Sequence, residues 1–274
     1  MATPKRKRTD LRPEDKLMSE YNTVNYDAEG AVAIVTIARP DAMNSFNTEL
    51  RKELAAALKQ AADNSDIRAV VLTGEGRSFC AGADLKEVNE DIESVLQDEY
   101  RPVFEQIIGM EKPVIGAVNG SAAGIGMSIA LACDLLVMDE NAFLLSPFTT
   151  ISLVPDGGLN WNLVKQLGYR RAFELSVESH RISADQCVDL GLANRTAPAD
   201  TLVDDAVAWA RSLAERAPLS VAATKKAMRH AMSGSWADTF DIEAPIQQKL
   251  RHSEDCSEGV RAFFEKRKPD FKGK

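Results

Sequence analysis

Three glycine-bearing segments stand at points where the backbone must turn sharply or approach a neighbour closely. They are residues 78–85 (SFCAGADL), 119–126 (NGSAAGIG) and 154–158 (VPDGG). The second segment opens an apolar helix directly after a predicted strand. Its unpaired backbone N–H groups and the positive end of the helix dipole suit a developing oxyanion. A second main-chain amide from residues 81–85 would complete an oxyanion hole with two donors.

The same segments do not match the common nucleotide and serine-hydrolase motifs. Ile129 stands where the third glycine of GxGxxG belongs, so a dinucleotide fold is not expected. No glycine precedes Lys-Ser or Lys-Thr as in a Walker A loop, and the chain has no GxSxG elbow. The chemistry expected of these loops therefore depends on backbone amides.

Metal chemistry has little support in the sequence. The histidines form no HExxH-type cluster, and the cysteines lie far apart with no CxxC pair. The residues concerned are His180, His230, His252, Cys80, Cys133, Cys187 and Cys256. We expect no metal, and this cysteine usage is typical of a reducing compartment, which favours a cytoplasmic location.

The elements that would position these loops alternate between strand and helix. The β-branched run at 31–37 (AVAIVTI) predicts a buried strand, which the Arg39-Pro40 step ends. Asn47 is placed to cap a following amphipathic helix. Its apolar positions are Leu50, Leu54, Leu58 and Ala61. Further buried strands are predicted at 69–73, 113–118 and 134–138.

The carboxyl half has a different character, because beyond about residue 160 the pattern predicts almost only helix. Two capping boxes begin helices there, Ser183 with Gln186 and Ser235 with Asp238. Long periodic segments run over 202–213 and 221–232, and Pro218 marks a joint before the last helices. A strand-and-helix core followed by a helical end is an α/β design.

Composition limits the class of protein. The chain has 274 residues, of which 45% are hydrophobic and 27% charged, values typical of a globular fold. The longest apolar stretches, such as 125–133, are too short to span a bilayer, so no membrane segment is expected. The net charge of −8 argues against a nucleic-acid surface.

The amino end is the exception to the acidic balance. Residues 1–17 hold six bases against three acids and few apolar side chains, so they predict a disordered basic arm before a second methionine, Met18. We interpret the arm as an inert extension or expression remnant in preference to a functional basic tail.

Taken together, the motifs resemble the crotonase superfamily, the enoyl-CoA hydratase/isomerase family. The resemblance extends in order from about Tyr26 to Lys274. It is carried by RPDAMNSF (39–46), SFCAGADLKEV (78–88), KPVIGAVNGSAAGIGMSIALACD (112–134), VPDGG (154–158), the stretch 181–192 and EGVRAFFEKRKPDF (258–271). It implies a spiral of ββα units at 18–215 that binds acyl-CoA, and a helical region at 216–274 that forms homotrimers, which often pair into hexamers.

The resemblance also implies the site. An acyl-CoA thioester carbonyl would lie between the backbone amides of Ala83 and Ile125, and coenzyme A would enter as part of the substrate, with no separate cofactor. Isoleucine at 125 replaces a glycine common in the family, which keeps the N–H and narrows the space around it. The residues that would line the coenzyme A cleft are Ala42, Asn44, Ala81, Asp84 and Leu85.

The reaction is suggested by which acids are present. Hydratases of this family use two glutamates, and their positions hold Ser128 and Phe148 here. A serine and a phenylalanine cannot both activate water and deliver a proton to the α-carbon, so ordinary hydration is not expected.

One carboxylate remains, that of Asp156. Pro-Asp-Gly-Gly alone is an ordinary turn sequence. Through the resemblance, however, Asp156 occupies the acid position of the family's 3-enoyl to 2-enoyl isomerases and of its aroyl-CoA dehalogenases. We expect isomerisation, with an apolar wall of Phe148, Leu153 and Leu159 raising the pKa of Asp156.

Three alternatives stay open. A dehalogenase would need aromatic residues around the ring, and the sequence has only 6% aromatic residues and no evident cluster, so it ranks lower. Hydration by other residues is a second alternative. The third is a non-catalytic acyl-CoA-binding or scaffold module, for which the basic arm would be a targeting element.

Overall fold

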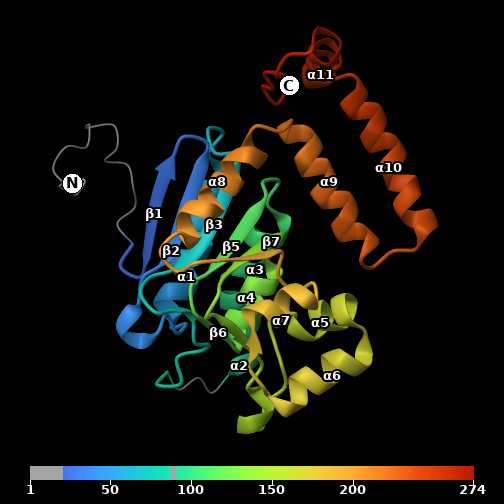
Figure 1. Cartoon of the computed structure of the whole chain (residues 1–274). Coiled ribbons are helices and arrows are strands. Elements are labelled where there is room, and N and C mark those ends of the chain that lie inside the picture. Colours follow the sequence, from blue (N-terminus) through green and yellow to red (C-terminus); the bar gives the residue numbers. More distant parts are fainter. Residues whose placement is uncertain (1–20, 88–90) are drawn as a thin grey trace, which may run out of the picture.

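The four strands predicted from β-branched runs form the centre of a six-stranded sheet (Figure 1). The structure, a computed structural model, describes residues 21–87 and 91–274, so the basic arm at 1–17 and Met18 lie outside the described residues. The sheet has the order β1 (Val24–Glu29), β2 (Val32–Ile37), β3 (Ala69–Gly74), β5 (Val114–Val118), β7 (Leu135–Asp139) and β10 (Arg195–Ala197). All neighbours pair in parallel except β1 and β2.

A second sheet of four short strands grows beside the first. Its order is β4 (Ser78–Cys80), β6 (Ser121–Ala123), β8 (Phe143–Leu145) and β9 (Ile182–Ser183). Successive strands alternate between the two sheets, as β3 then β4, β5 then β6 and β7 then β8, and helices follow each pair. This alternation is a spiral of ββα units, so the predicted α/β fold class is confirmed.

Helices connect the strands and cover the first sheet. They are η2 (Pro40–Ala42), α1 (Thr48–Asp63), α2 (Ile92–Ser94), η3 (Val95–Tyr100), α3 (Arg101–Gly109), α4 (Ile125–Ala132), η4 (Phe148–Ile151), α5 (Leu159–Leu167), α6 (Tyr169–Glu178), α7 (Ala184–Asp189), α8 (Leu202–Ala214), α9 (Pro218–Ala231), α10 (Trp236–Arg251) and α11 (Glu254–Glu265). The predicted N-cap is present, because the Asn47 side chain accepts a hydrogen bond from the Leu50 amide. Both predicted capping boxes also form, at Ser183 and Ser235.

The period-two alternation of the central strands divides the core into two layers. In β2, Val32 and Ile34 face α8, whereas Val35 and Ile37 belong to the cluster that holds α1, α3 and α4. The two faces of the sheet are therefore both covered by helices, as a parallel sheet requires. The start of α4 lies in the second layer, next to the short strands.

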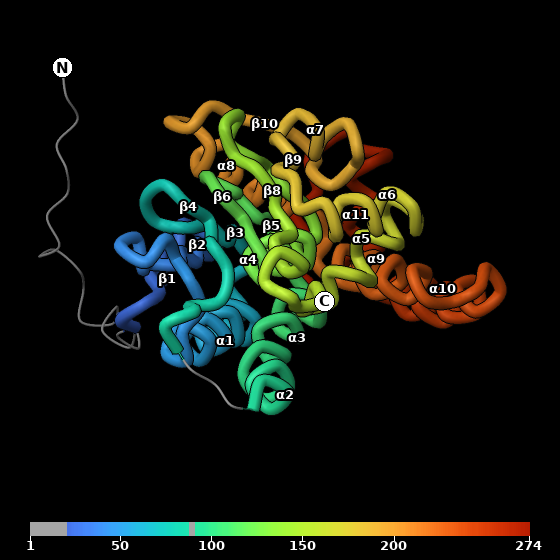
Figure 2. Tube along the Cα trace, turned by 90° about the horizontal axis from the view of Figure 1, so that it is seen from below, coloured from blue at the N-terminus to red at the C-terminus, as the bar shows by residue number. Residues whose placement is uncertain are grey.

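The carboxyl half is less purely helical than expected. Strands β9 and β10 each complete the edge of a sheet. They were not predicted, because strands of two and three residues are too short to give a periodic signal. After α8, helices α9, α10 and α11 project away from the sheets (Figures 1 and 2). Large apolar side chains are exposed on α10 and α11: Trp236 (79%), Phe240 (54%), Phe263 (79%) and Phe264 (76%).

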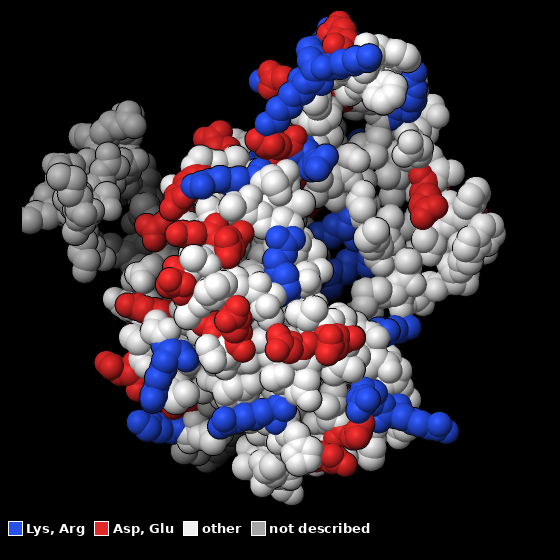
Figure 3. All heavy atoms as spheres, in the orientation of Figure 1, with Lys and Arg blue, Asp and Glu red and all other residues white. Residues whose placement is uncertain are grey.

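Charge is unevenly distributed over the molecule. Acidic side chains are spread over the part of the surface that holds β1 and α8, and basic side chains line the hollow between this body and α9 (Figure 3). Among the described residues, no helix is long and apolar enough to cross a bilayer. The four cysteines are free thiols, three of them buried.

Candidate active site

The two predicted oxyanion loops lie against each other. Gly124 has φ +56° and ψ −126°, a conformation that favours glycine, and a Cβ built there would lie 3.7 Å from the Cα of Gly82. A Cβ at Gly82 would lie 3.3 Å from the carbonyl oxygen of Ala123. The contact places the amides of Ala83 and Ile125, each one residue further along, at the same point of the molecule.

Backbone pairing leaves both of these amides free. Ala83 forms a parallel bridge with Phe46, in which the Phe46 amide donates to Gly82 O (2.8 Å) and the Asp84 amide donates to Phe46 O (2.9 Å). The Ala83 amide therefore points to the opposite side. Ile125 is the first residue of α4, where an amide has no intrahelical acceptor. In the described part of the chain neither amide donates a hydrogen bond, so the pair is available for a ligand oxygen.

Asp156 lies in a turn that docks onto the first turn of α4. The Ser128 hydroxyl donates to the backbone carbonyl of Asp156 at 2.9 Å. Gly157 has φ +60°, and a Cβ there would lie 2.6 Å from Cδ1 of Ile125 and 2.9 Å from Cβ of Ser128. Only glycine fits this approach, so the VPDGG segment packs closely on the side chains of Ile125 and Ser128 in the first turn of α4.

The Asp156 carboxyl group is held in a poorly solvated place. Its Oδ1 atom is inaccessible to solvent and has no hydrogen-bond partner among the described residues. Burial raises the pKa of Asp156 to about 6, because the charged form loses hydration. A carboxyl group with a pKa in this range can both accept and return a proton near neutral pH.

The two hydratase glutamate positions carry no acid in the structure either. Ser128 is fully buried, and its hydroxyl is engaged with the carbonyl oxygens of Asp156 and Gly124. Phe148 is 7% exposed, and its ring tip would lie 3.8 Å from a Cβ at Gly124. Both residues therefore border the oxyanion loops and supply no proton-transfer group.

The residues predicted to line the coenzyme A cleft lie together. Segment 42–46 runs beside segment 81–84, with the Ala81 amide donating to Met43 O (3.0 Å). The Asn44 side chain is buried and bonds the backbone of Arg39, Glu75 and Ser78. Asn44 thus holds the loop in place through its side chain.

Asp84 and Leu85 differ in their surroundings. The Asp84 carboxylate pairs with Arg39 at 3.0 Å, and a hydrogen bond from Arg39 contributes to lowering the pKa of Asp84 against the opposing effect of desolvation. Leu85 is 77% exposed, so its side chain is available to cover an incoming ligand. Ala42 ends the short helix η2 and is half-buried.

The expected apolar wall needs correction. Phe148 and Leu159 are buried, but Leu153 is 56% exposed. The ring closest to Gly157 is instead that of Phe104 on α3, whose Cζ would lie 2.6 Å from a Cβ at Gly157. The sequence also showed no evident aromatic cluster. In the structure, however, Tyr100 and Phe104 of one helical segment lie next to the Asp156 turn.

A cavity of about 720 Å³ adjoins this turn. Its lining consists of Gly157 and Gly158 together with Leu96, Gln97, Tyr100, Arg101, Phe104, Glu105, Ile108 and Gly109. The cavity has the size of a small-molecule site, and one of its lining rings, that of Tyr100, stacks on Phe46 with centroids 5.9 Å apart. Residues 95–109 were missed as site residues, although their spacing of aromatic and aliphatic positions is that of an inward helix face.

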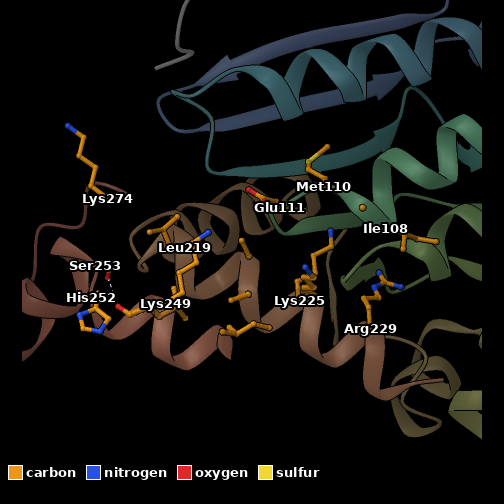
Figure 4. A pocket seen from close by; sticks show the side chains of 16 residues that line it. Ile108, Met110, Glu111, Leu219, Lys225, Arg229, Lys249, His252, Ser253 and Lys274 are labelled. Atoms are coloured by element: carbon orange, nitrogen blue, oxygen red, sulfur yellow. Dashed lines mark hydrogen bonds between the residues drawn. The ribbon is translucent and has the colours of Figure 1, made fainter. Parts of the chain in front are cut away.

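A second cavity, of about 790 Å³, lies between the end of α3 and helices α9 and α10 (Figure 4). Lys225 and Arg229 reach into its wall from α9. Neither the oxyanion amides nor Asp156 borders this cavity. Gly157 and Gly158, which follow Asp156, line the cavity of about 720 Å³ and not this one, so the smaller of these two cavities is the one that adjoins the Asp156 turn.

The spiral of ββα units and the paired amides at the start of α4 define the chain as a crotonase-fold protein. The model of the enoyl-CoA hydratase/isomerase family matches residues 27–274, and the chain belongs to this family as one of its acyl-CoA enzymes. A probable enoyl-CoA hydratase of Rhodobacter capsulatus is 38% identical, covering 93% of this chain and 99% of the relative.

Two other matches show the range of the family. The 1,2-epoxyphenylacetyl-CoA isomerase of Escherichia coli is 36% identical over 90% of this chain and 97% of its own. A solved structure described as an enoyl-CoA hydratase subunit of Geobacillus kaustophilus is 34% identical, with a TM-score of 0.89, covering 93% of this chain and 100% of that one. Relatives thus carry both hydratase and isomerase names.

Proposed function

We propose that the protein moves the double bond of a 3-enoyl-CoA to give the 2-enoyl-CoA, with Asp156 as the acid/base. The observation that carries this proposal is the buried, unpartnered Asp156 carboxyl group in the turn that packs on Ile125 and Ser128, with non-ionisable Ser128 and Phe148 at the two hydratase positions. Double-bond migration needs one carboxylate, whereas hydration needs water activation and separate protonation.

Asp156 and the two amides are sufficient for the reaction. The Asp156 carboxylate removes a proton from C2 of the 3-enoyl thioester, and the electron pair of that C–H bond moves into the thioester carbonyl. The resulting dienolate oxygen accepts hydrogen bonds from the Ala83 and Ile125 amides. The protonated Asp156 then returns the proton to C4, which re-forms the carbonyl and leaves the double bond between C2 and C3.

The surroundings of Asp156 support both half-steps. With its pKa raised to about 6, the carboxyl group is ionised near neutral pH and binds the proton more readily than an exposed aspartate. The cavity beside Gly157 carries the apolar and aromatic side chains of Leu96, Tyr100, Phe104 and Ile108, which suit an acyl chain, beside three polar or charged ones. Segment 42–46 and Leu85 would take the coenzyme A end.

Hydration by other residues is the second candidate, because relatives with hydratase names are at least as common as isomerases. A scaffold that binds acyl-CoA without reaction is the third. Removing residues 1–17 distinguishes this scaffold from the two enzymes. If the arm is a targeting element, its loss would alter the protein's location or partners and leave acyl-CoA binding intact.

The test is a panel of 3-enoyl-, 2-enoyl- and hydroxyacyl-CoA esters, read by mass and by absorbance of the conjugated thioester. We expect isomerisation of the 3-enoyl ester, and Asp156→Asn should lose about 10²–10⁴-fold in kcat while still binding ligand. The matched control is Asp189→Asn, which changes an exposed aspartate at the end of α7.

Three outcomes would contradict the proposal. Full isomerase activity in Asp156→Asn would remove the acid/base role. Hydration of crotonyl-CoA at an ordinary enzymatic rate, on the order of 10 per second, would mean that another residue activates water. Halide release from a haloaroyl-CoA would assign Asp156 as a nucleophile.

We further infer that three or six copies assemble through the carboxyl-terminal helices. The support is the set of exposed aromatic side chains on α10 and α11, which a soluble monomer would rarely leave uncovered together. Light scattering should give a trimer or hexamer at micromolar concentration. A monomer under these conditions would contradict the inference.

A further inference from the structure

Tyr100 ends the only six-residue π-helical turn in the described chain, η3, immediately before α3. Its ring is 4% exposed and lies between two partners: it stacks on Phe46, with centroids 5.9 Å apart, and the Arg51 guanidinium carbon lies 4.9 Å from its centroid. Wide turns of this kind occur frequently at functional sites. The ring is thus clamped in one orientation, beneath the Phe46 bridge that positions Ala83.

The hydroxyl group of this clamped ring has no acceptor for its proton among the described residues, and its neighbour Arg51, which can only donate, acts to lower the pKa of Tyr100. In residues 21–87 and 91–274, the buried side-chain atoms without a hydrogen-bond partner include Tyr100 Oη and Asp156 Oδ1. One is a donor and the other an acceptor. An unmade hydrogen bond is unfavourable for each buried group, and two such groups in one place call for a state in which they pair.

Contacts place the two groups at one wall of the site. Phe104 follows Tyr100 by one helical turn, so the two rings project from the same face. The tip of Phe104 touches the Gly157 position, and Tyr100 and Gly157 both line the cavity of about 720 Å³. The charge of Asp156 also contributes to the raised pKa of Tyr100, which is about 12 mainly because of burial. Tyr100 therefore stays a donor at neutral pH.

We propose that Tyr100 is a positioning residue for Asp156. When the carboxylate is charged, Tyr100 Oη donates a hydrogen bond to Asp156 Oδ1, and Asp156 Oδ2 is left to face the acyl chain. This assignment rests on the proposed role of Asp156 as the base. The hydrogen bond would fix the orientation of the Asp156 carboxyl group and favour its charged form.

Other charged or titratable groups face the pair from the surrounding elements. They are Arg51 of α1, Cys80 of β4, Glu99 of η3, and Arg101 and Glu105 of α3. Burial raises the pKa of Cys80 to about 12, so its thiol stays neutral. Arg51 is paired with Glu99 at 2.6 Å and with Glu87 at 3.2 Å. Arg101 and Glu105 line the cavity, where Tyr100 is the neutral donor whose proton has no acceptor among the described residues.

The test compares Tyr100→Phe with Tyr26→Phe. Tyr26 is the matched control, because its hydroxyl is also buried without a partner but lies on β1, away from the cavity. A hydrogen bond to the charged form lowers a carboxyl pKa. We therefore expect Tyr100→Phe to move the acidic limb of the kcat profile upward by about one to two pH units, with KM unchanged, whereas Tyr26→Phe keeps the wild-type profile.

A direct measurement makes the result independent of turnover. The Asp156 carboxyl carbon, followed by NMR through a pH titration of the intact protein, should titrate at higher pH in Tyr100→Phe than in the wild type. If Tyr100→Phe does not fold, fluorotyrosine at position 100 retains the ring and strengthens the donor, and should lower the Asp156 pKa.

The outcomes separate this inference from the proposed function. If Asp156→Asn is inactive and the titration of Asp156 does not respond to position 100, the positioning role is wrong and the acid/base role stands. If the titration responds while Asp156→Asn keeps full activity, the hydrogen bond exists and the catalytic assignment of Asp156 is wrong. A shift of the same size in Tyr26→Phe would also overturn the positioning role.

Discussion

Two regions of the chain treat their polar groups in opposite ways. At the foot of α9, Asp134 pairs with Lys225 at 2.7 Å and with Arg229 at 2.9 Å, and accepts the Val114 amide at 2.9 Å. Lys225 also donates to the carbonyls of Ile107 and Lys112. At the start of α4, by contrast, Asp156 Oδ1 and two backbone amides have no partner in the described residues.

The contrast teaches where function lies in this fold. A fully paired cluster such as Asp134–Lys225–Arg229 fixes the position of a helix, and adding a ligand would gain nothing there. An unpaired cluster is less favourable for the folded state and becomes satisfied only when a ligand or a proton arrives. The Asp134 cluster should therefore contribute stability, and the Asp156 site should contribute activity.

The largest effect is expected from Asp134→Ala. It leaves the half-buried Lys225 and Arg229 without their counter-charge, which should lower the free energy of unfolding by about 3–5 kcal/mol. Turnover by the folded fraction should stay near the wild-type value. Urea unfolding at fixed protein concentration measures this, and Asp63→Ala, which breaks an exposed pair with Lys59, should change stability by less than about 1 kcal/mol. An equal loss in both variants would remove the contrast.

Ala83→Pro should have the next largest effect, on rate. Proline deletes one oxyanion donor, a change worth about 10²–10³ in kcat. The control is Ala83→Gly, which keeps the N–H group and should retain activity. Circular dichroism would establish that both variants fold, and unchanged turnover in a folded Ala83→Pro would mean that the Ala83 amide does not bind the thioester oxygen.

The smallest effect is a gain in stability in Asp156→Asn. The folded-state pKa of Asp156 is raised to about 6 from a usual value of 3.8, so ionisation opposes folding as pH rises through 6. Asparagine carries no such charge, and it should stabilise the protein by about 2–3 kcal/mol at pH 8. Near pH 4 the two proteins should be equally stable. A loss of stability in Asp156→Asn at pH 8 would show that the charge of Asp156 does not destabilise the folded protein.

The fold could be predicted where local patterns are long enough to carry information. The β-branched runs of β2 and β3 and the Asn47 cap of α1 are properties of neighbouring residues, and they appear in the structure as expected. Strand β1 was missed because its sequence VNYDAE is half polar and exposed, and it forms only by pairing with β2. Strand β10 was missed because it owes its existence to the edge of β7.

The site divides in the same way. The glycine loops and the Asp156 turn could be found from short motifs, because close backbone approach demands glycine at Gly124 and Gly157. Tyr100 could not be found, since its burial depends on a π-helical turn and on Arg51, which lies on another helix, 48 residues before its partner Glu99. The place of Asn44 at the coenzyme A cleft stays a prediction, and only the structure reveals that its side chain bonds the backbone.

The spatial order of the strands follows their order along the chain in both sheets. Each new ββα unit therefore adds to the edge left by the one before, and a ribosome-bound chain extends both sheets in one direction. Until β9 and β10 emerge, each sheet ends in an unpaired parallel strand, the kind of edge that invites association with other chains. Once β10 has paired with β7, the open edge of the first sheet is a strand of three residues, and so short an edge offers little for another chain to pair with.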